Sequence, residues 1–150
     1  MFDDLRELYQ EVILDHGRRP RHGARLATFD ASAKGDNPMC GDRVQVFLQR
    51  NAEGRVRQVG FEARGCAISI ASADLMAEVV AGLSDADVRT LAEEFRNMAR
   101  SGRLPEGDGA MERLRPLAGV HEYPSRVKCA TLPWHALLAA LDGQGDASSE

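Results

Sequence analysis

The sequence predicts a compact single domain of the α/β (α+β) class, in which a three-stranded antiparallel sheet packs against helices. Apolar residues recur at helical spacing near both ends of the chain, whereas segments between them show the partial alternation of strands. A chain of 150 residues is also long enough to bury a core of its own. We therefore expect one domain over residues 1–142, followed by a polar C-terminal tail at residues 143–150.

The first predicted element is an amphipathic helix over residues 3–16. Its apolar side chains are three and four positions apart, and Asp3 and Asp4 carry the negative charge that suits the first turn of a helix. The following "HGRRPRHG" contains proline and glycine, which end the helical pattern.

Three strand-like segments follow, at residues 24–32, 43–50 and 55–64. The last two are separated by "NAEG", a turn signal that predicts an antiparallel hairpin. Three strands are the minimum for a small independent sheet, so we expect all three segments to pair.

Helical patterns occupy most of the second half of the chain. Residues 66–82 are small and apolar, which predicts a buried helix, and residues 84–100 open with a Ser-Asp cap and predict a more polar one. A short helical segment at residues 110–120 precedes a final helix at residues 123–142. That last helix contains Pro133, which we expect near its first turn or at a kink.

The composition excludes several classes of function. A mild net charge of -4 gives no electrostatic reason to expect nucleic-acid binding, which would need a clustered basic face. The first 16 residues carry acidic side chains every few positions, so we expect neither a signal peptide nor a membrane span. A cytoplasmic protein without nucleic-acid or membrane partners is the expectation.

The chemistry of the sequence is concentrated at three cysteines, which cannot all form disulfides with one another. Cys40 lies in "NPMCGD", where Pro38 and Gly41 indicate a turn. Cys66 follows the glycine that ends the third strand, and Cys129 stands at or near the start of the last helix. All three thiols are thus predicted at the ends of elements, and a helix N-terminus favours a thiolate.

Asp42 supplies a fourth ligand, since three sulfurs and one carboxylate oxygen could complete a tetrahedral zinc site. The spacing is weak support by itself because no Cys-x-x-Cys pair exists. Such a site has a net charge of about -2, which nearby cations including Arg126 and Lys128 could offset.

Other interpretations stay open on the residues alone. The cysteines could be three unrelated core side chains, and the four histidines are further candidate ligands. We expect His135 to be a packing residue, because its helix is apolar, and His16 and His22 to belong to a solvated basic loop. Glu62 is a candidate general base, although a glutamate in a strand is more often simply outward-facing.

The motifs resemble a known family, the U-type iron-sulfur cluster assembly proteins of the IscU, NifU N-terminal and SufU group. The resemblance rests on "NPMCGD", "GCAIS", the third cysteine before a long helix and the opening "LYQEVILDHGRRPRHG". It covers nearly the whole chain except the tail and implies the compact SufU/IscU-like fold. In the scaffold members of this family a histidine precedes the third cysteine, giving "HC", whereas in this sequence Lys128 precedes Cys129. Together with the long segment at residues 84–123, this difference resembles the SufU branch.

The resemblance to the SufU branch implies a zinc-dependent sulfur acceptor. Such a protein takes persulfide sulfur from a PLP-dependent cysteine desulfurase of the SufS type and passes it to downstream iron-sulfur assembly proteins. Whether the chain counts as an enzyme, a sulfurtransferase, is left open. The alternative is a scaffold on which the same ligands transiently hold an iron-sulfur cluster.

Two further classes are disfavoured. A hydrolytic zinc enzyme such as a deaminase needs H-x-E and P-C-x-x-C motifs, which this sequence lacks. A purely structural zinc module is also disfavoured, because a core of this size can fold without metal.

Combining the ligand count with the resemblance, we predict that Zn2+ is bound by Cys40, Asp42, Cys66 and Cys129. Among the thiols Cys40 is predicted to accept sulfur, because Gly41 permits its turn to adjust. The resemblance implies that a histidine of the desulfurase replaces Cys40 on the metal. Arg126 is the second predicted catalytic residue, a fixed positive charge that steadies a thiolate or guides the persulfide loop of the partner.

Overall fold

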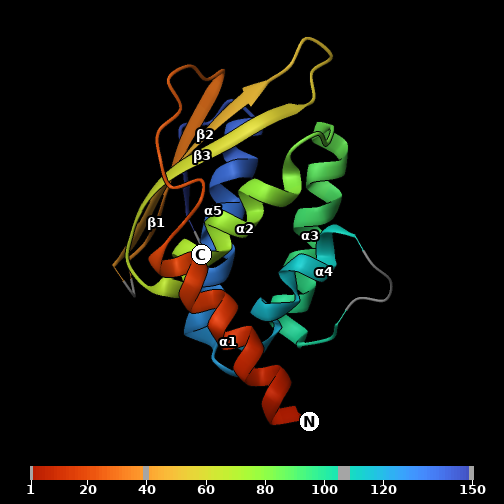
Figure 1. The fold of residues 1–150 in the computed structure, drawn as a ribbon. Coiled ribbons are helices and arrows are strands. Elements are labelled where there is room, and N and C mark those ends of the chain that lie inside the picture. The colour runs from red at the N-terminus through yellow and green to blue at the C-terminus, as the bar shows by residue number, and fades with distance from the viewer. Residues whose placement is uncertain (1, 39–40, 105–108, 149–150) are drawn as a thin grey trace.

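The computed structural model describes residues 2–38, 41–104 and 109–148 (Figure 1). In chain order the elements are α1 (Phe2–Arg18), β1 (Ala31–Asn37), β2 (Asp42–Arg50), β3 (Val56–Arg64), α2 (Ala67–Val80), α3 (Asp85–Ser101), α4 (Ala110–Leu114), the 3-10 helix η1 (Arg115–Glu122), α5 (Pro124–Leu141) and β4 (Asp146–Ser148). The predicted helices therefore all form, and the α+β class is confirmed. Cys40 lies outside the described residues.

The strands form one sheet in the order β3-β2-β1-β4. β2 and β3 are the antiparallel hairpin that the turn at residues 51–54 predicts, and β1 pairs antiparallel with β2. The β1–β2 register ends with Asn37 opposite Asp42. Only residues 38–41 therefore connect these two strands, and the predicted metal-binding motif spans that connection.

The prediction of a strand at residues 24–32 is wrong in its position, because β1 begins only at Ala31. Its sequence, ASAKGDN, is poor in the branched and aromatic residues that favour strands. Packing outweighs this weak propensity: a Cβ added at Gly35 would lie 3.0 Å from the side chain of Leu132 in α5. The structure also adds a fourth strand that the sequence does not predict, since β4 pairs in parallel with β1 within the predicted tail.

Two apolar helices form the layer against the sheet. α5 contacts β1 and β2, α2 contacts β3, and the two helices contact each other. α3 packs on α5 on the side away from the sheet, and α1 lies against α2 (Figure 1). The predicted burial of α2 is confirmed. Trp134 of α5 stacks on Phe95 of α3 at 4.9 Å between ring centroids, which fixes α3 on α5. Pro133 lies well inside α5 rather than in its first turn.

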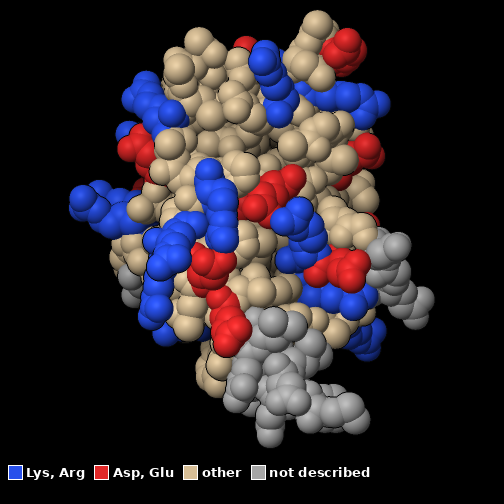
Figure 2. All heavy atoms as spheres, viewed as in Figure 1, with Lys and Arg blue, Asp and Glu red and all other residues tan. Residues whose placement is uncertain are grey.

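The surface carries charges of both signs. Figure 2 shows Lys and Arg side chains interspersed with Asp and Glu over the face that is viewed in Figure 1. In the described part of the chain, no helix combines the length and apolar character needed to cross a membrane.

Asp74 of α2 is a carboxylate without exposed surface. One of its oxygens is hydrogen-bonded to Nδ1 of His16 at 2.5 Å, and the other accepts the backbone N–H of His22 at 2.8 Å. These bonds hold the end of α1 and the segment after it against α2. The prediction that His16 belongs to a solvated loop is wrong, because only 12% of its side chain is exposed.

Replacing Asp74 by alanine is expected to destabilise the fold by about 1–3 kcal/mol, the usual cost of leaving buried polar partners unsatisfied. Urea denaturation measures the loss. The matched control is Asp15→Ala, which removes a carboxylate whose ion pair with Arg21 is solvent-exposed and contributes little. Equal unfolding midpoints for the two variants would contradict the structural role of Asp74.

Candidate metal centre

The first residue of β2 places a carboxylate in the interior. Asp42 is 1% exposed, and its Oδ1 accepts the backbone N–H of Cys66 at 2.9 Å. Cys66 is the N-cap residue of α2, where backbone N–H groups lack partners within the helix. The hydrogen bond therefore joins the start of β2 to the start of α2.

This close approach requires a glycine before Cys66. Gly65 has a φ of +138°, a conformation that other residues rarely adopt. A Cβ at this position would collide with the carboxylate and with Cα of Asp42. Gly65 thus leaves the space in which the Asp42 side chain lies.

The third donor comes from α5. Cys129 has no exposed surface, and Nδ2 of Asn37, the last residue of β1, donates a hydrogen bond to its sulfur at 3.8 Å. Because α5 begins at Pro124, Cys129 lies more than one turn inside the helix. The prediction that Cys129 stands at the end of an element is therefore wrong, and burial in the helix packing holds it in place.

The three donors converge on one point. One ligand atom from each of Asp42, Cys66 and Cys129 lies within 4.8 Å of the other two, and both cysteines are free thiols. A sulfur and a carboxylate oxygen bound to one tetrahedral zinc ion, at about 2.3 and 2.0 Å from it, are about 3.5 Å apart. Cys66 Sγ and Asp42 Oδ2 are 3.9 Å apart, so a shift of a few tenths of an ångström brings them to this spacing. The donor set therefore fits a thiophilic metal ion such as Zn2+.

Cys40, the predicted fourth ligand, lies outside the described residues, so its role stays a prediction. Gly41 beside it has a φ of +72° and donates its N–H to the carbonyl of Asn37 at 2.9 Å. Asp42, the next residue, is already one of the converging donors. Cys40 is thus only two positions before this donor in the sequence.

The predicted neutralising cations differ in their surroundings. Arg126 is exposed in the first turn of α5, and Lys128 is half-buried beside Cys129. Neither has a carboxylate within ion-pair distance among the described residues, whereas Arg43 pairs with Asp36 at 3.4 Å. Arg126 and Lys128 are therefore available to interact with negative charge near the thiolates.

The histidines do not join this centre in the described part of the chain. His16 forms a second group with Asp74 and Glu78, but hydrogen bonds already engage both oxygens of Asp74, and Arg113 binds Glu78 at 2.5 Å. The sequence pattern does not predict this group, because its only local signal is Asp74, a single aspartate inside an apolar helix. Glu62 is exposed, as expected for an outward-facing strand residue.

Comparison with known proteins bears on this arrangement. Residues 8–130 match the family described as the NifU-like N-terminal domain. The chain belongs to this family. The match includes Asp42, Cys66 and Cys129, and it confirms the resemblance that the cysteine motifs indicate.

Relatives in this family carry two kinds of name. The chain is 34% identical over 143 residues to "Iron-sulfur cluster assembly scaffold protein IscU" of Streptococcus pyogenes serotype M1, covering 95% of this chain and 88% of that protein. It is 33% identical over 134 residues to "Zinc-dependent sulfurtransferase SufU" of Bacillus subtilis, covering 89% of both. The crystal structure of FiSufU from Fervidobacterium islandicum AW-1, described as an iron-sulfur cluster assembly scaffold protein for the SUF system, superposes with a TM-score of 0.76 at 31% identity, over 90% of this chain and 97% of that one.

Gly65→Ala is expected to lower zinc affinity by roughly tenfold or more, a typical effect of displacing the support of a metal ligand. The substitution forces the Asp42 carboxylate out of its place. Zinc per chain and competition with a chromophoric chelator measure the change.

Gly54→Ala is the matched control, because Gly54 also has a positive φ of +80° but nothing lies within 4 Å of an added Cβ. Both variants should lose some thermal stability through backbone strain, and only Gly65→Ala should lose metal. If Gly65→Ala kept its zinc affinity, Asp42 would not be a metal ligand whose position depends on the space that Gly65 leaves.

Proposed function

We propose that the protein is a zinc-dependent sulfur acceptor that takes persulfide sulfur from a cysteine desulfurase for iron-sulfur cluster assembly. The observation that carries the proposal is the convergence of Asp42, Cys66 and Cys129 at the end of the connection that contains Cys40. The 33% identity to a relative named a zinc-dependent sulfurtransferase supports it. Lys128 stands before the third cysteine, where scaffold members of the family have a histidine, and this difference also favours the sulfur acceptor.

Zn2+ is the resident ion in this proposal, held by Asp42, Cys66, Cys129 and Cys40. When bound, the ion keeps its cysteine ligands deprotonated at neutral pH and shields them from oxidation. Asp42 contributes the only oxygen ligand, and its bond from the N–H of Cys66 keeps the carboxylate in place.

The surroundings of the cysteines support different roles. Cys129 is fully buried in α5, so its sulfur cannot reach a partner unless a packed helix moves. Cys66 is partly exposed at the N-cap of α2, where its N–H bond to Asp42 holds its backbone in place. Cys40 belongs to a connection of four residues between two strands, next to a glycine that adopts a positive φ. Cys40 is therefore the thiol that we assign to sulfur transfer.

The transfer is a thiol-disulfide type exchange. The Cys40 thiolate attacks the outer sulfur of the persulfide on the desulfurase, and the sulfur–sulfur bond of that persulfide breaks. The desulfurase cysteine departs as a thiolate, and Cys40 becomes the persulfide. Arg126 is exposed three residues before Cys129, where its guanidinium can attract the anionic persulfide of the partner.

The partners follow from this chemistry. A PLP-dependent cysteine desulfurase of the SufS type would supply the sulfur, and a downstream iron-sulfur assembly protein would receive it.

The second candidate function is a cluster scaffold, favoured by the 34% identity to a relative named as one. There the iron-sulfur cluster is cargo, because thiolates bind iron as well as zinc. A stable cluster after reconstitution with iron and sulfide would favour the scaffold, and persistent stoichiometric zinc favours the sulfur acceptor.

The ligand assignment is tested with single alanine variants of Cys40, Asp42, Cys66 and Cys129. Each is expected to lose most of its zinc during dialysis, because three donors bind far more weakly than four. The thiolate-to-cobalt absorption of the cobalt-substituted protein should weaken in each cysteine variant and shift in Asp42→Ala. Asp36→Ala, an exposed carboxylate on the neighbouring strand, is the control and should keep full zinc. A Cys40→Ala protein with full zinc and unchanged cobalt absorption would remove Cys40 from the site.

The transfer step is tested by reaction with desulfurase and cysteine, followed by alkylation and mass spectrometry of the persulfide. Sulfur is expected on Cys40, and Cys40→Ser should abolish stimulation of the desulfurase. Arg126→Ala should keep zinc and thermal stability but reduce stimulation, whereas Arg57→Ala, another exposed arginine, should not. Persulfide found mainly on Cys66 or Cys129 would overturn the assignment of Cys40, and full stimulation by Arg126→Ala would overturn the role of Arg126.

A further inference from the structure

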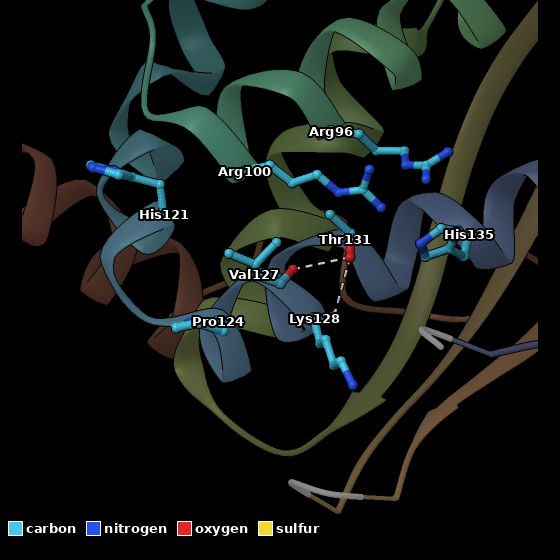
Figure 3. Close-up of a pocket in the computed structure, with 8 residues that line it drawn as sticks. All are labelled: Arg96, Arg100, His121, Pro124, Val127, Lys128, Thr131 and His135. Carbon is cyan, nitrogen blue, oxygen red and sulfur yellow. Dashed lines mark hydrogen bonds between the residues drawn. The ribbon is translucent and has the colours of Figure 1, made fainter.

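A cleft of about 570 Å³ lies between α3 and α5, with η1 at one end (Figure 3). Its walls carry Arg96 and Arg100 from α3 and Lys128, Thr131 and His135 from α5. None of these side chains is a proposed metal ligand, and only Lys128 has been related to the metal centre, as a cation near Cys129. Lys128 immediately precedes Cys129, so the cleft and the metal centre share the same turn of α5.

The positive charges of the cleft lack strong partners. Arg100 and Lys128 have no carboxylate within ion-pair distance among the described residues. Among the described residues, Arg96 forms an ion pair with Glu93 alone, at 3.5 Å, and the Glu93 side chain is 65% exposed. Some arginines elsewhere in the described chain bind carboxylates more closely, as in the Arg50–Asp85 pair at 2.9 Å. The cleft thus gathers positive charge in a chain whose 23 acidic residues outnumber its 19 basic ones.

The two arginines concentrate this charge at one side of the cleft. Arg96 and Arg100 are one helical turn apart on α3, and like charges at this spacing destabilise a helix. Figure 3 shows both side chains extending from α3 toward the side of the cleft where Thr131 and His135 lie. Burial, and then the charges of Arg96 and Arg100, lower the pKa of His135 below its ordinary value of 6.5.

We propose that this cleft binds the phosphate group of a small phosphorylated molecule or free phosphate. The guanidinium groups of Arg96 and Arg100 suit a tetrahedral dianion, because each presents a fork of donors to two oxygens. The concave shape and the volume are those of small-molecule sites, about 300–1,000 Å³. His121 and Pro124, at the η1 end, leave room for an organic group attached to the phosphate. The proposal does not rest on the sulfur-acceptor function.

The test is a 1H–15N NMR titration of the full chain with inorganic phosphate, with AMP and with adenosine, at an ionic strength held constant with chloride. Phosphate and AMP are expected to shift the amide signals of residues 96–101 and 124–135 in a saturable way. Adenosine, which lacks the phosphate, should not. The pKa of His135 should rise with either anion, because the bound negative charge offsets Arg96 and Arg100. Tighter binding of AMP than of phosphate identifies a phosphorylated molecule as the ligand, and equal binding identifies free phosphate.

Matched variants locate the site. Arg96→Ala and Arg100→Ala should each weaken binding by about tenfold or more, since hydrogen bonds to charged groups are strong, and Arg57→Ala, an exposed arginine outside the cleft, should not. Shifts that do not saturate, that adenosine reproduces, or that survive Arg100→Ala would overturn the proposal. Zinc content and desulfurase stimulation are measured on the same variants, so a failure of phosphate binding is distinguished from a failure of the sulfur-acceptor function.

Discussion

Burial of α5 is the constraint on which the rest of the structure depends. The helix contacts the sheet, α2 and α3, so apolar residues must occupy most of its circumference. Trp134 fixes its rotation against Phe95 of α3, and Leu132 packs where Gly35 of β1 leaves space. Once these contacts fix the rotation of the helix, Cys129 is buried beside Asn37 at the end of β1.

The same rotation gives one helix two chemically different sides. Cys129 meets the acidic and thiol donors at the start of β2 and α2, whereas Lys128 and Thr131 line the cationic cleft under α3. A centre of three thiolates and one carboxylate around a divalent ion has a net charge of about -2. Lys128 is next to Cys129 in the sequence and also lines the cleft, so its charge is placed near both.

Elements whose structure is decided by a local pattern can be predicted from this sequence, and elements decided by distant contacts cannot. Turn chemistry at residues 51–54 predicts the β2–β3 hairpin, and the small apolar residues of α2 predict its burial. The position of β1 is missed because pairing and packing, not propensity, select ASAKGDN as a strand. The hydrogen bond of His16 to Asp74 joins residues 58 positions apart, so no local pattern reveals it. The burial of Cys129 likewise depends on which helices surround α5.

The candidate metal centre differs in kind from a zinc finger, in which the ion organises the fold. Here contacts that do not involve an ion already hold three donors. Asp42 is fixed by the N–H of Cys66, Cys66 by its place at the start of α2, and Cys129 by the packing of α5. Preorganised donors lose little conformational freedom when they bind an ion. A fold that is stable through its own core can therefore present one more thiol, which we propose to be the reactive Cys40, from a short connection without risk to the rest of the structure.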